Sequence, residues 1–260
     1  MNRPLSPVTS KIVLAAIEVF VAGFCETKSR TWPYESIRND NVWTLRDVER
    51  KNAKGYRKEE WIAFNLAAEK VHLLAQQGTR GRYFVCPIIG LGDSPEQLKA
   101  SYKELGYRLL STEPMFVHSL QKIPRCRANV KIKLLRKPDQ AESYAIASRV
   151  RPEPPHRIVD PAYRQYLAFH DEEIVGWVRS VETPRGNYCT NLVVKPAWRR
   201  QGIARALLAQ MLRDDRKRGA VQNVLLSSHT GALLYPHLGY QQIGTLFIFV
   251  PKKRLTTSEK

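Results

Sequence analysis

The amino-acid sequence predicts an α/β (α+β) fold, in which helices and strands alternate along most of the chain. An apolar, β-branched run at Leu192–Val194 is followed by a basic turn and then by apolar residues with helical spacing. A further strand, a short helix and a last apolar run follow this helix. In addition, Tyr102–Tyr107 (YKELGY) recurs as Tyr235–Tyr240 (YPHLGY) at an offset of 133 residues, so part of this organisation occurs twice.

Helices in the first 120 residues are indicated by apolar residues three and four positions apart and by capping signals. Thr9 or Ser10 can cap the first helix, and Ser94 followed by Pro95 is typical of a helix start. Pro87 indicates a bulge or an edge position in its strand. The expected elements are a helix at about 10–25, a short strand at 42–45, a helix at 58–77, a strand at 82–91 and a helix at 95–105.

The first expected helix contains an apolar run, Ile12–Phe24, which has some features of a secretion signal. Glu18 interrupts this run, no small-residue cleavage site follows it, and it is too short to cross a bilayer. We therefore expect a buried helix and no membrane partner. The cysteines lack metal-binding spacing and indicate reduced thiols in a cytoplasmic protein: Cys25, Cys86, Cys126 and Cys189.

A basic, proline-bearing stretch at Ser119–Val130 is interpreted as a linker to the second half of the chain. Alternating apolar and charged residues at Val130–Leu135 then indicate an edge strand. The remaining expected elements are a helix at 138–149, a loop at 150–161, strands at 166–170, 174–180 and 188–194, a helix at 202–218, a strand at 221–228, a short helix at 229–238 and two final strands that include residues 246–250.

The basic turn after Leu192–Val194 has the features of a phosphate-binding site. The first N–H groups of a helix lack intrahelical partners, and the macrodipole makes that end positive. Gly202 allows an anion to approach the backbone closely, and Arg199, Arg200 and Arg205 add positive charge. The turn lacks the motifs of a Walker loop and of a dinucleotide fingerprint. The alternative is a helix start whose arginines are only solvated.

Two motifs in this region resemble the GNAT superfamily of N-acetyltransferases. The acetyl-CoA motif of that family, Arg/Gln-x-x-Gly-x-Gly/Ala, is matched by Arg199, Gly202 and Ala204. Its later signature, Tyr-x-x-Leu-Gly-Phe/Tyr, is matched at Tyr235–Tyr240. The two motifs lie one helix and one strand apart, as in the family, and the resemblance covers residues 129–252. It implies a mixed, mostly antiparallel sheet flanked by helices.

Through the repeated motif, the amino-terminal part also resembles the second half of a GNAT domain. Arg50–Arg57 precedes its expected helix but does not provide the acetyl-CoA motif. We therefore expect a degenerate, partial GNAT-like domain that packs on the active half or shapes the acceptor groove. A second CoA site is the alternative. The expected domains are 1–120 for the degenerate part, 121–128 for the linker and 129–260 for the acetyltransferase.

The resemblance implies direct transfer of an acetyl group from acetyl-CoA, the cosubstrate, to a primary amine in a ternary complex. The apolar strand residues are implied to pair with the pantetheine arm and to polarise the thioester carbonyl. The basic turn is implied to hold the pyrophosphate, and Ser228 stands where the family often has asparagine. The implied cofactor-binding residues are Leu192, Val193, Val194, Arg199, Arg200, Gln201, Gly202, Ile203, Ala204, Arg205 and Ser228.

Tyr235 matches the tyrosine that acts in many relatives as general acid toward the CoA sulfur. A phenol suits this role because its ordinary pKa of about 10 keeps it protonated near neutrality. Packing alone is the alternative. Glu182 and His229 are candidates for the catalytic base, and a chain of water molecules is the alternative. No metal-binding motif, nucleophile elbow or close Cys–His pair is present in the sequence.

The net charge of +18 is unevenly distributed, with +4 in residues 1–120 and +14 in residues 121–260. This excess fits the phosphates of CoA and favours an acceptor that carries negative charge. Without an RNA-binding motif, nucleic acid is not expected as a partner. We expect a small-molecule or peptide amine as acceptor, and a homodimer remains open. The alternative function is a non-enzymatic module that binds CoA or nucleic acid through the same basic surface.

Overall fold

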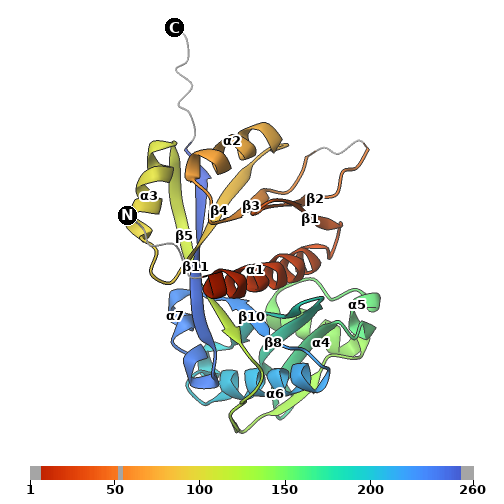
Figure 1. The fold of residues 1–260 in the computed structure, drawn as a ribbon. Coiled ribbons are helices and arrows are strands. Elements are labelled where there is room, and N and C mark those ends of the chain that lie inside the picture. Colours follow the sequence, from red (N-terminus) through yellow and green to blue (C-terminus); the bar gives the residue numbers. More distant parts are fainter. Residues whose placement is uncertain (1–6, 52–54, 253–260) are drawn as a thin grey trace.

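One continuous sheet of eleven strands runs through the computed structural model, which describes residues 7–51 and 55–252 (Figure 1). The strands are β1 Tyr34–Asn39, β2 Val42–Asp47, β3 Glu59–Phe64, β4 Tyr83–Gly90, β5 Tyr107–His118, β6 Lys131–Leu134, β7 Tyr163–His170, β8 Glu173–Thr183, β9 Gly186–Val194, β10 Asn223–Leu226 and β11 Gln241–Pro251. Their order across the sheet is β1-β2-β3-β4-β11-β5-β10-β9-β8-β7-β6. In the described part, β3–β4 and β9–β10 pair in parallel and the other neighbours are antiparallel. The predicted mixed, mostly antiparallel sheet is confirmed.

Helices cover both faces of this sheet. In each half one helix connects the two parallel strands and another follows them, and the long first helix crosses the middle of the molecule (Figure 1). They are α1 Pro7–Lys28, α2 Ala68–Gly78, α3 Pro95–Glu104, α4 Pro138–Ser148, α5 Pro155–Val159, α6 Ile203–Lys217 and α7 His229–Ala232, with 3-10 turns η1 Pro196–Trp198 and η2 Tyr235–Leu238.

The first helix, α1, is buried as expected from its apolar sequence. Val13, Ile17 and Phe20 pack in one core with side chains of strands from both halves of the chain, among them Ile62 and Tyr188. No described helix is long and apolar enough to cross a membrane. The four cysteines are free thiols, of which three are buried.

The helix expected at 58–77 is wrong in its first half, which forms β3 and a loop before α2 begins. Trp61 packs on the α2 side of the sheet, whereas Ile62 and Phe64 pack on the α1 side. Because β3 is buried on both faces, its sequence is apolar without the alternation of a half-exposed strand. The spacing of its apolar residues therefore imitates a helix.

The strand that contains Pro87 lies inside the sheet, between β3 and β11, so the expected edge position is wrong. Pro87 stands opposite Ala63 of β3. On the other side, the register with β11 includes Val85 and Ile88 but not Pro87. The interior strand therefore accommodates the proline at a position where the ladder with β11 is interrupted.

The two halves of the chain exchange strands. β5, from the first half, lies between β11 and β10, while β11, from the second half, lies between β4 and β5. Two strands were expected at the carboxyl end, but the described residues form one, and β5 occupies the place beside β10. The repeated motifs Tyr102–Tyr107 and Tyr235–Tyr240 thus lead into two strands that pair antiparallel with each other. The domain boundaries at residues 120 and 129 stay a prediction.

The expected elements of the second half are present with small shifts. β6 is an edge strand, as its alternation indicated. The proline-rich loop contains the short helix α5, and the helix expected at 229–238 divides into α7 and the 3-10 turn η2. The apolar stripe of α6 is fully buried, with Leu207, Leu208 and Met211 each at 0% exposure.

Candidate active site

The parallel strands β9 and β10 pair only where they begin. Asn187 stands opposite Asn223 and Tyr188 opposite Val224, and beyond these positions the register ends. A groove of about 800 Å³ lies farther along, between the carboxyl end of β9, the start of α6 and α7. Ten of the eleven predicted cofactor-binding residues line it: Leu192, Val193, Val194, Arg199, Arg200, Gly202, Ile203, Ala204, Arg205 and Ser228. Gln201 is not among the lining residues, and its amide donates to the carbonyl of Ala197 at 3.4 Å.

A β-bulge lies in β9 where this strand separates from β10, while its pairing with β8 continues beyond the bulge. Trp177 of β8 stands opposite Val193, but Arg179 stands opposite Thr190, so β9 contains one extra residue there. Asn191 lies in this bulge with a φ of 57°, in the left-handed region that asparagine tolerates better than most residues. A bulge disrupts the ladder and leaves backbone groups unpaired. The strand expected at 188–194 contained no bulge, and Asn191 is the one residue in the sequence that signals it.

The turn before α6 has the geometry of an anion site. Arg200 and Gly202 have φ values of 65° and 77°, and Gly202 is the N-cap of the fifteen-residue helix α6. A Cβ on Gly202 would lie 3.3 Å from the carbonyl oxygen of Arg127, so the turn leaves little room for a side chain. Arg199 donates to the carbonyl of Val194 at 3.2 Å, which fixes the turn against the end of β9.

The charges around this turn are available to an anionic ligand. Arg199, Arg200 and Arg205 are exposed, and no carboxylate of the described residues forms an ion pair with them. Together with the free N–H groups of the first turn of α6, they form a site that suits an anion such as a pyrophosphate.

Tyr235, on the turn η2, is not among the residues that line the groove, but its ring lies behind Gly231, which does line it: a Cβ on Gly231 would be 4.0 Å from that ring. Tyr235 is 7% exposed, and its ring packs 5.4 Å from Phe116 of β5 and 5.5 Å from Tyr240. Burial raises the pKa of Tyr235, the nearby Cys189 raises it further, and a hydrogen bond with Ser227 opposes them. The phenol is therefore protonated at neutral pH and can act as a proton donor, but not as a base.

Two other predicted site residues, Ser228 and His229, lie at the start of α7, beside the groove. The hydroxyl of Ser228 accepts from the backbone N–H of Gly231 at 3.2 Å, so this groove residue also caps α7. His229 lies next to the groove, with Nε2 2.7 Å from the hydroxyl of Thr112 on β5. It lines a neighbouring cavity of about 480 Å³ that shares Ser228 with the groove.

Glu182 lies away from the groove, against our expectation. It stands opposite Asn187, five residues before the first groove residue of β9, which is roughly 17 Å along the strand. Its carboxylate forms ion pairs with Arg164 at 3.2 Å and with Arg218 at 3.6 Å. The turn that follows β8 therefore points to the opposite end of the sheet, and Glu182 cannot reach a substrate in the groove.

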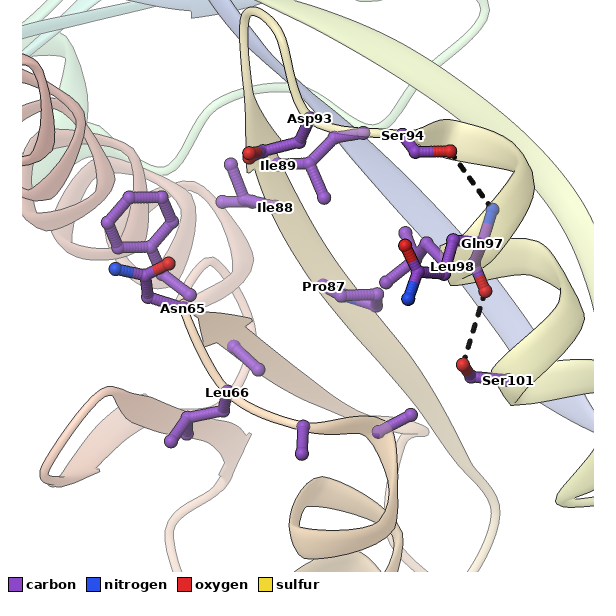
Figure 2. Close-up of a pocket in the computed structure, with 14 residues that line it drawn as sticks. Asn65, Leu66, Pro87, Ile88, Ile89, Asp93, Ser94, Gln97, Leu98 and Ser101 are labelled. Atoms are coloured by element: carbon purple, nitrogen blue, oxygen red, sulfur yellow. Dashed lines mark hydrogen bonds between the residues drawn. The ribbon is translucent and has the colours of Figure 1, made fainter. Parts of the chain in front are cut away.

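The first half of the chain contains a cavity at the corresponding place, between the carboxyl ends of β3 and β4 and the starts of α2 and α3 (Figure 2). Its volume is about 400 Å³. Here the parallel strands stay paired as far as Phe64 and Ile88, so no groove opens between them. The loop before α2 contains Asn65 and Leu66 instead of arginines, and Glu69 adds negative charge to the first turn. These features disfavour a CoA pyrophosphate.

Comparisons with known proteins agree with this arrangement. Residues 159–242 match the family model described as an acetyltransferase (GNAT) domain. A GCN5-related N-acetyltransferase from Kribbella flavida is similar in structure, with a TM-score of 0.61 and 15% identity over 93% of this chain and 97% of that one. A conserved protein of unknown function from Staphylococcus epidermidis gives a TM-score of 0.56 and 17% identity, over 86% and 97% of the two chains.

A third solved structure, a GCN5-related N-acetyltransferase from Sphaerobacter thermophilus, gives a TM-score of 0.54 and 17% identity over 94% and 93% of the two chains. At such low identity these structures establish the fold and not the substrate. No curated protein sequence matches the chain.

Proposed function

Since the chain carries an acetyltransferase (GNAT) domain at residues 159–242, we propose that it transfers an acetyl group from acetyl-CoA to a primary amine. The observation that carries this proposal is the groove beside β9, where β9 and β10 separate, with the basic start of α6 among its lining and a protonated tyrosine behind its lining residue Gly231. This is one site with a place for an anion, a place for an extended arm and a proton donor.

The residues have distinct roles in this proposal. Arg199, Arg200 and Arg205 hold the pyrophosphate together with the first N–H groups of α6. The backbone of β9 beyond the bulge at Asn191 pairs with the pantetheine amides and polarises the thioester carbonyl. Acetyl-CoA, when bound, supplies the activated acetyl thioester. Tyr235 donates its proton to the sulfur as the C–S bond breaks, because a neutral thiol leaves more readily than a thiolate.

The amino-terminal half has a structural role in this proposal, as a degenerate GNAT-like unit. Its cavity lacks the arginines and the separated strands of the groove, while its strand β5 contributes Phe116 to the wall behind Tyr235. We place the protein in the cytoplasm and expect the acceptor to be a small-molecule or peptide amine. The positive charge of residues 121–260 favours an acceptor with a negative group.

The experiment that tests the proposal follows release of free thiol from acetyl-CoA in the presence of a panel of amines. The panel contains 2-phenylethylamine, spermidine, a lysine peptide, β-alanine and β-alanine amide. Amine-dependent thiol release with formation of the N-acetyl product supports the proposal. Faster turnover of β-alanine than of its uncharged amide supports the preference for a negative group. Binding of acetyl-CoA without transfer to any of these amines would favour the non-enzymatic binding module instead.

A further inference from the structure

Glu113 on the exchanged strand β5 lies beside the end of β10. The last pair between these strands joins Leu226 to Met115, and Ser227 then donates its backbone N–H to the carbonyl of Pro114 at 3.1 Å. The next residue of β5, Glu113, lines the cavity of about 480 Å³ that contains Ser228 and therefore adjoins the groove. A residue from the first half of the chain thus borders the site formed by the second half.

The side chain of Glu113 lies on the face of the sheet that α1 covers. Its partner on β11 is Leu246, which packs in the same core as Met115 and Tyr188. Burial raises the pKa of Tyr188, and the charge of Glu113 raises it further. Tyr188 in turn is near enough to Tyr235 to raise the pKa of that phenol, after burial and Cys189. Glu113 and Tyr235 therefore lie on different faces of the sheet, both near the point where β9 and β10 separate. Tyr188 is close to both of them.

The described part of the chain offers the carboxylate of Glu113 no hydrogen-bond or ion-pair partner, and the residue is half-buried. The titratable groups around it are Tyr188 on β9, Cys86 on β4 and His229 at the start of α7. Burial raises the pKa of Glu113 above its ordinary value of 4.5 and is the one cause of this shift. A carboxylate in such a place is a stronger base than an exposed one.

We propose that Glu113, brought to the acetyl-transfer site by the exchange of β5, is the base that takes the proton from the acceptor amine. The inference rests on the proposed function, since it assigns a role within the same reaction. The cavity that Glu113 lines and the groove share Ser228, so the carboxylate and the cofactor site adjoin each other.

With Glu113 as base and Tyr235 as acid, the bonds and protons of the acetyl transfer balance. The nitrogen of a neutral amine forms a bond to the thioester carbon, and its N–H proton passes to the carboxylate of Glu113. The C–S bond breaks, and the sulfur takes the proton of Tyr235. Glu113 is then protonated and Tyr235 is a phenolate, and transfer of one proton from the first to the second through solvent restores both. The products are the N-acetyl amine and CoA with a free thiol.

This assignment gives the first half of the chain a chemical reason to be present. Its own cavity lacks the basic turn of a CoA site, yet its strand supplies the base to the other half. The second half alone has a basic turn and a tyrosine, but of the two glutamates on its strand β8, Glu182 is held by Arg164 and Arg218 at the far end of the sheet and Glu173 forms an ion pair with Lys195.

The test compares Glu113→Gln with Glu104→Gln in the full chain, using saturating acetyl-CoA and the most active amine of the panel. Glutamine keeps the size of the side chain but cannot accept the proton. We expect Glu113→Gln to lower kcat by about 10²- to 10⁴-fold, a range typical of lost general-base catalysis, while the affinity for acetyl-CoA and the melting temperature stay unchanged. Glu104 is an exposed carboxylate at the end of α3, and its replacement should leave kcat unchanged.

The pH profile separates a base from a residue that only orients the amine. In the wild type, kcat/KM should fall on the acid side with a midpoint above pH 4.5, and this limb should be absent in Glu113→Gln and restored in Glu113→Asp. A variant with wild-type kcat, or with a raised KM for the amine and an unchanged kcat, would overturn the role of Glu113 alone. Absence of turnover in the wild type would overturn the proposed function and this role together.

Discussion

Removal of one hydroxyl group from Tyr235 tests the acid that the proposed reaction requires. Tyr235→Phe keeps the ring and its contacts with Phe116 and Tyr240 at 5.4 and 5.5 Å. The repeat provides a matched control, because Tyr102 occupies the corresponding place 133 residues earlier. Tyr102 is fully buried and stacks 4.6 Å from Phe249. Tyr102→Phe therefore makes the same chemical change in the half without a CoA groove.

The expected effects of the two substitutions differ strongly in rate and by about 1 kcal/mol in stability. Loss of a general acid lowers kcat by about 10²- to 10⁴-fold, which corresponds to about 3–5 kcal/mol of activation free energy. The hydrogen bond of Tyr235 with Ser227 contributes about 1 kcal/mol to the free energy of unfolding. The hydroxyl of Tyr102 has no hydrogen-bond partner among the described residues, so its removal should be neutral or slightly stabilising.

The assay measures thiol release at saturating acetyl-CoA and amine, together with calorimetric titration of acetyl-CoA. Tyr235→Phe should lose turnover and keep the affinity of the wild type, whereas Tyr102→Phe should keep both. Turnover of Tyr235→Phe within threefold of the wild type would refute the assignment of Tyr235 as the acid. It would leave packing against Phe116 as the role of this tyrosine.

Two further predictions concern the stability of the fold. Asp215 is fully buried and accepts from Arg164 at 2.8 Å, whereas the other carboxylate partner of Arg164, Glu182, is half-exposed. Asp215→Ala removes the buried partner of this guanidinium and should lower the free energy of unfolding by about 3–5 kcal/mol in urea titrations; a loss below 1 kcal/mol would contradict this role. Burial acts to raise the pKa of Asp47, but the hydrogen bonds and charge of Arg57 hold this pKa below its ordinary value of 3.8. Ionised Asp47 therefore stabilises the fold above pH 3.8, and this contribution is lost as the pH falls through the pKa of the folded state. The melting temperature of Arg57→Leu should therefore depend less on pH between 2 and 4 than that of the wild type, and identical profiles would exclude the pair as a cause of acid sensitivity.

The groove could be predicted from the sequence because its elements are local. Strand, turn and helix follow one another within residues 192–217, and helical spacing identified the buried stripe of α6. The turn residues Arg199 and Gly202 are close in sequence, so a motif could identify them. Ten of the eleven expected residues consequently lie around one cavity.

The features that the sequence did not reveal depend on contacts between distant segments. β5 and β10 pair through residues more than 100 positions apart in the sequence. A local sequence pattern does not predict which distant strands pair with each other. Glu113 was therefore invisible as a site residue, while Glu182 was selected because it follows a strand. The helix expected at 58–77 failed for a related reason, because β3 is covered on one face by α2 and on the other by α1, which is distant from it in sequence.

The most direct test of the central claim is calorimetric titration of acetyl-CoA into the wild type, Gly202→Glu and Gly202→Ala. Both substitutions place a Cβ 3.3 Å from the carbonyl of Arg127 at a φ of 77°, so they share the backbone strain. Glutamate alone adds negative charge at the expected pyrophosphate site. The account predicts micromolar or tighter binding by the wild type, weaker binding by Gly202→Ala and no detectable binding by Gly202→Glu. Equal affinity of the two variants, or no binding by the wild type, would contradict the assignment of this turn as the CoA site.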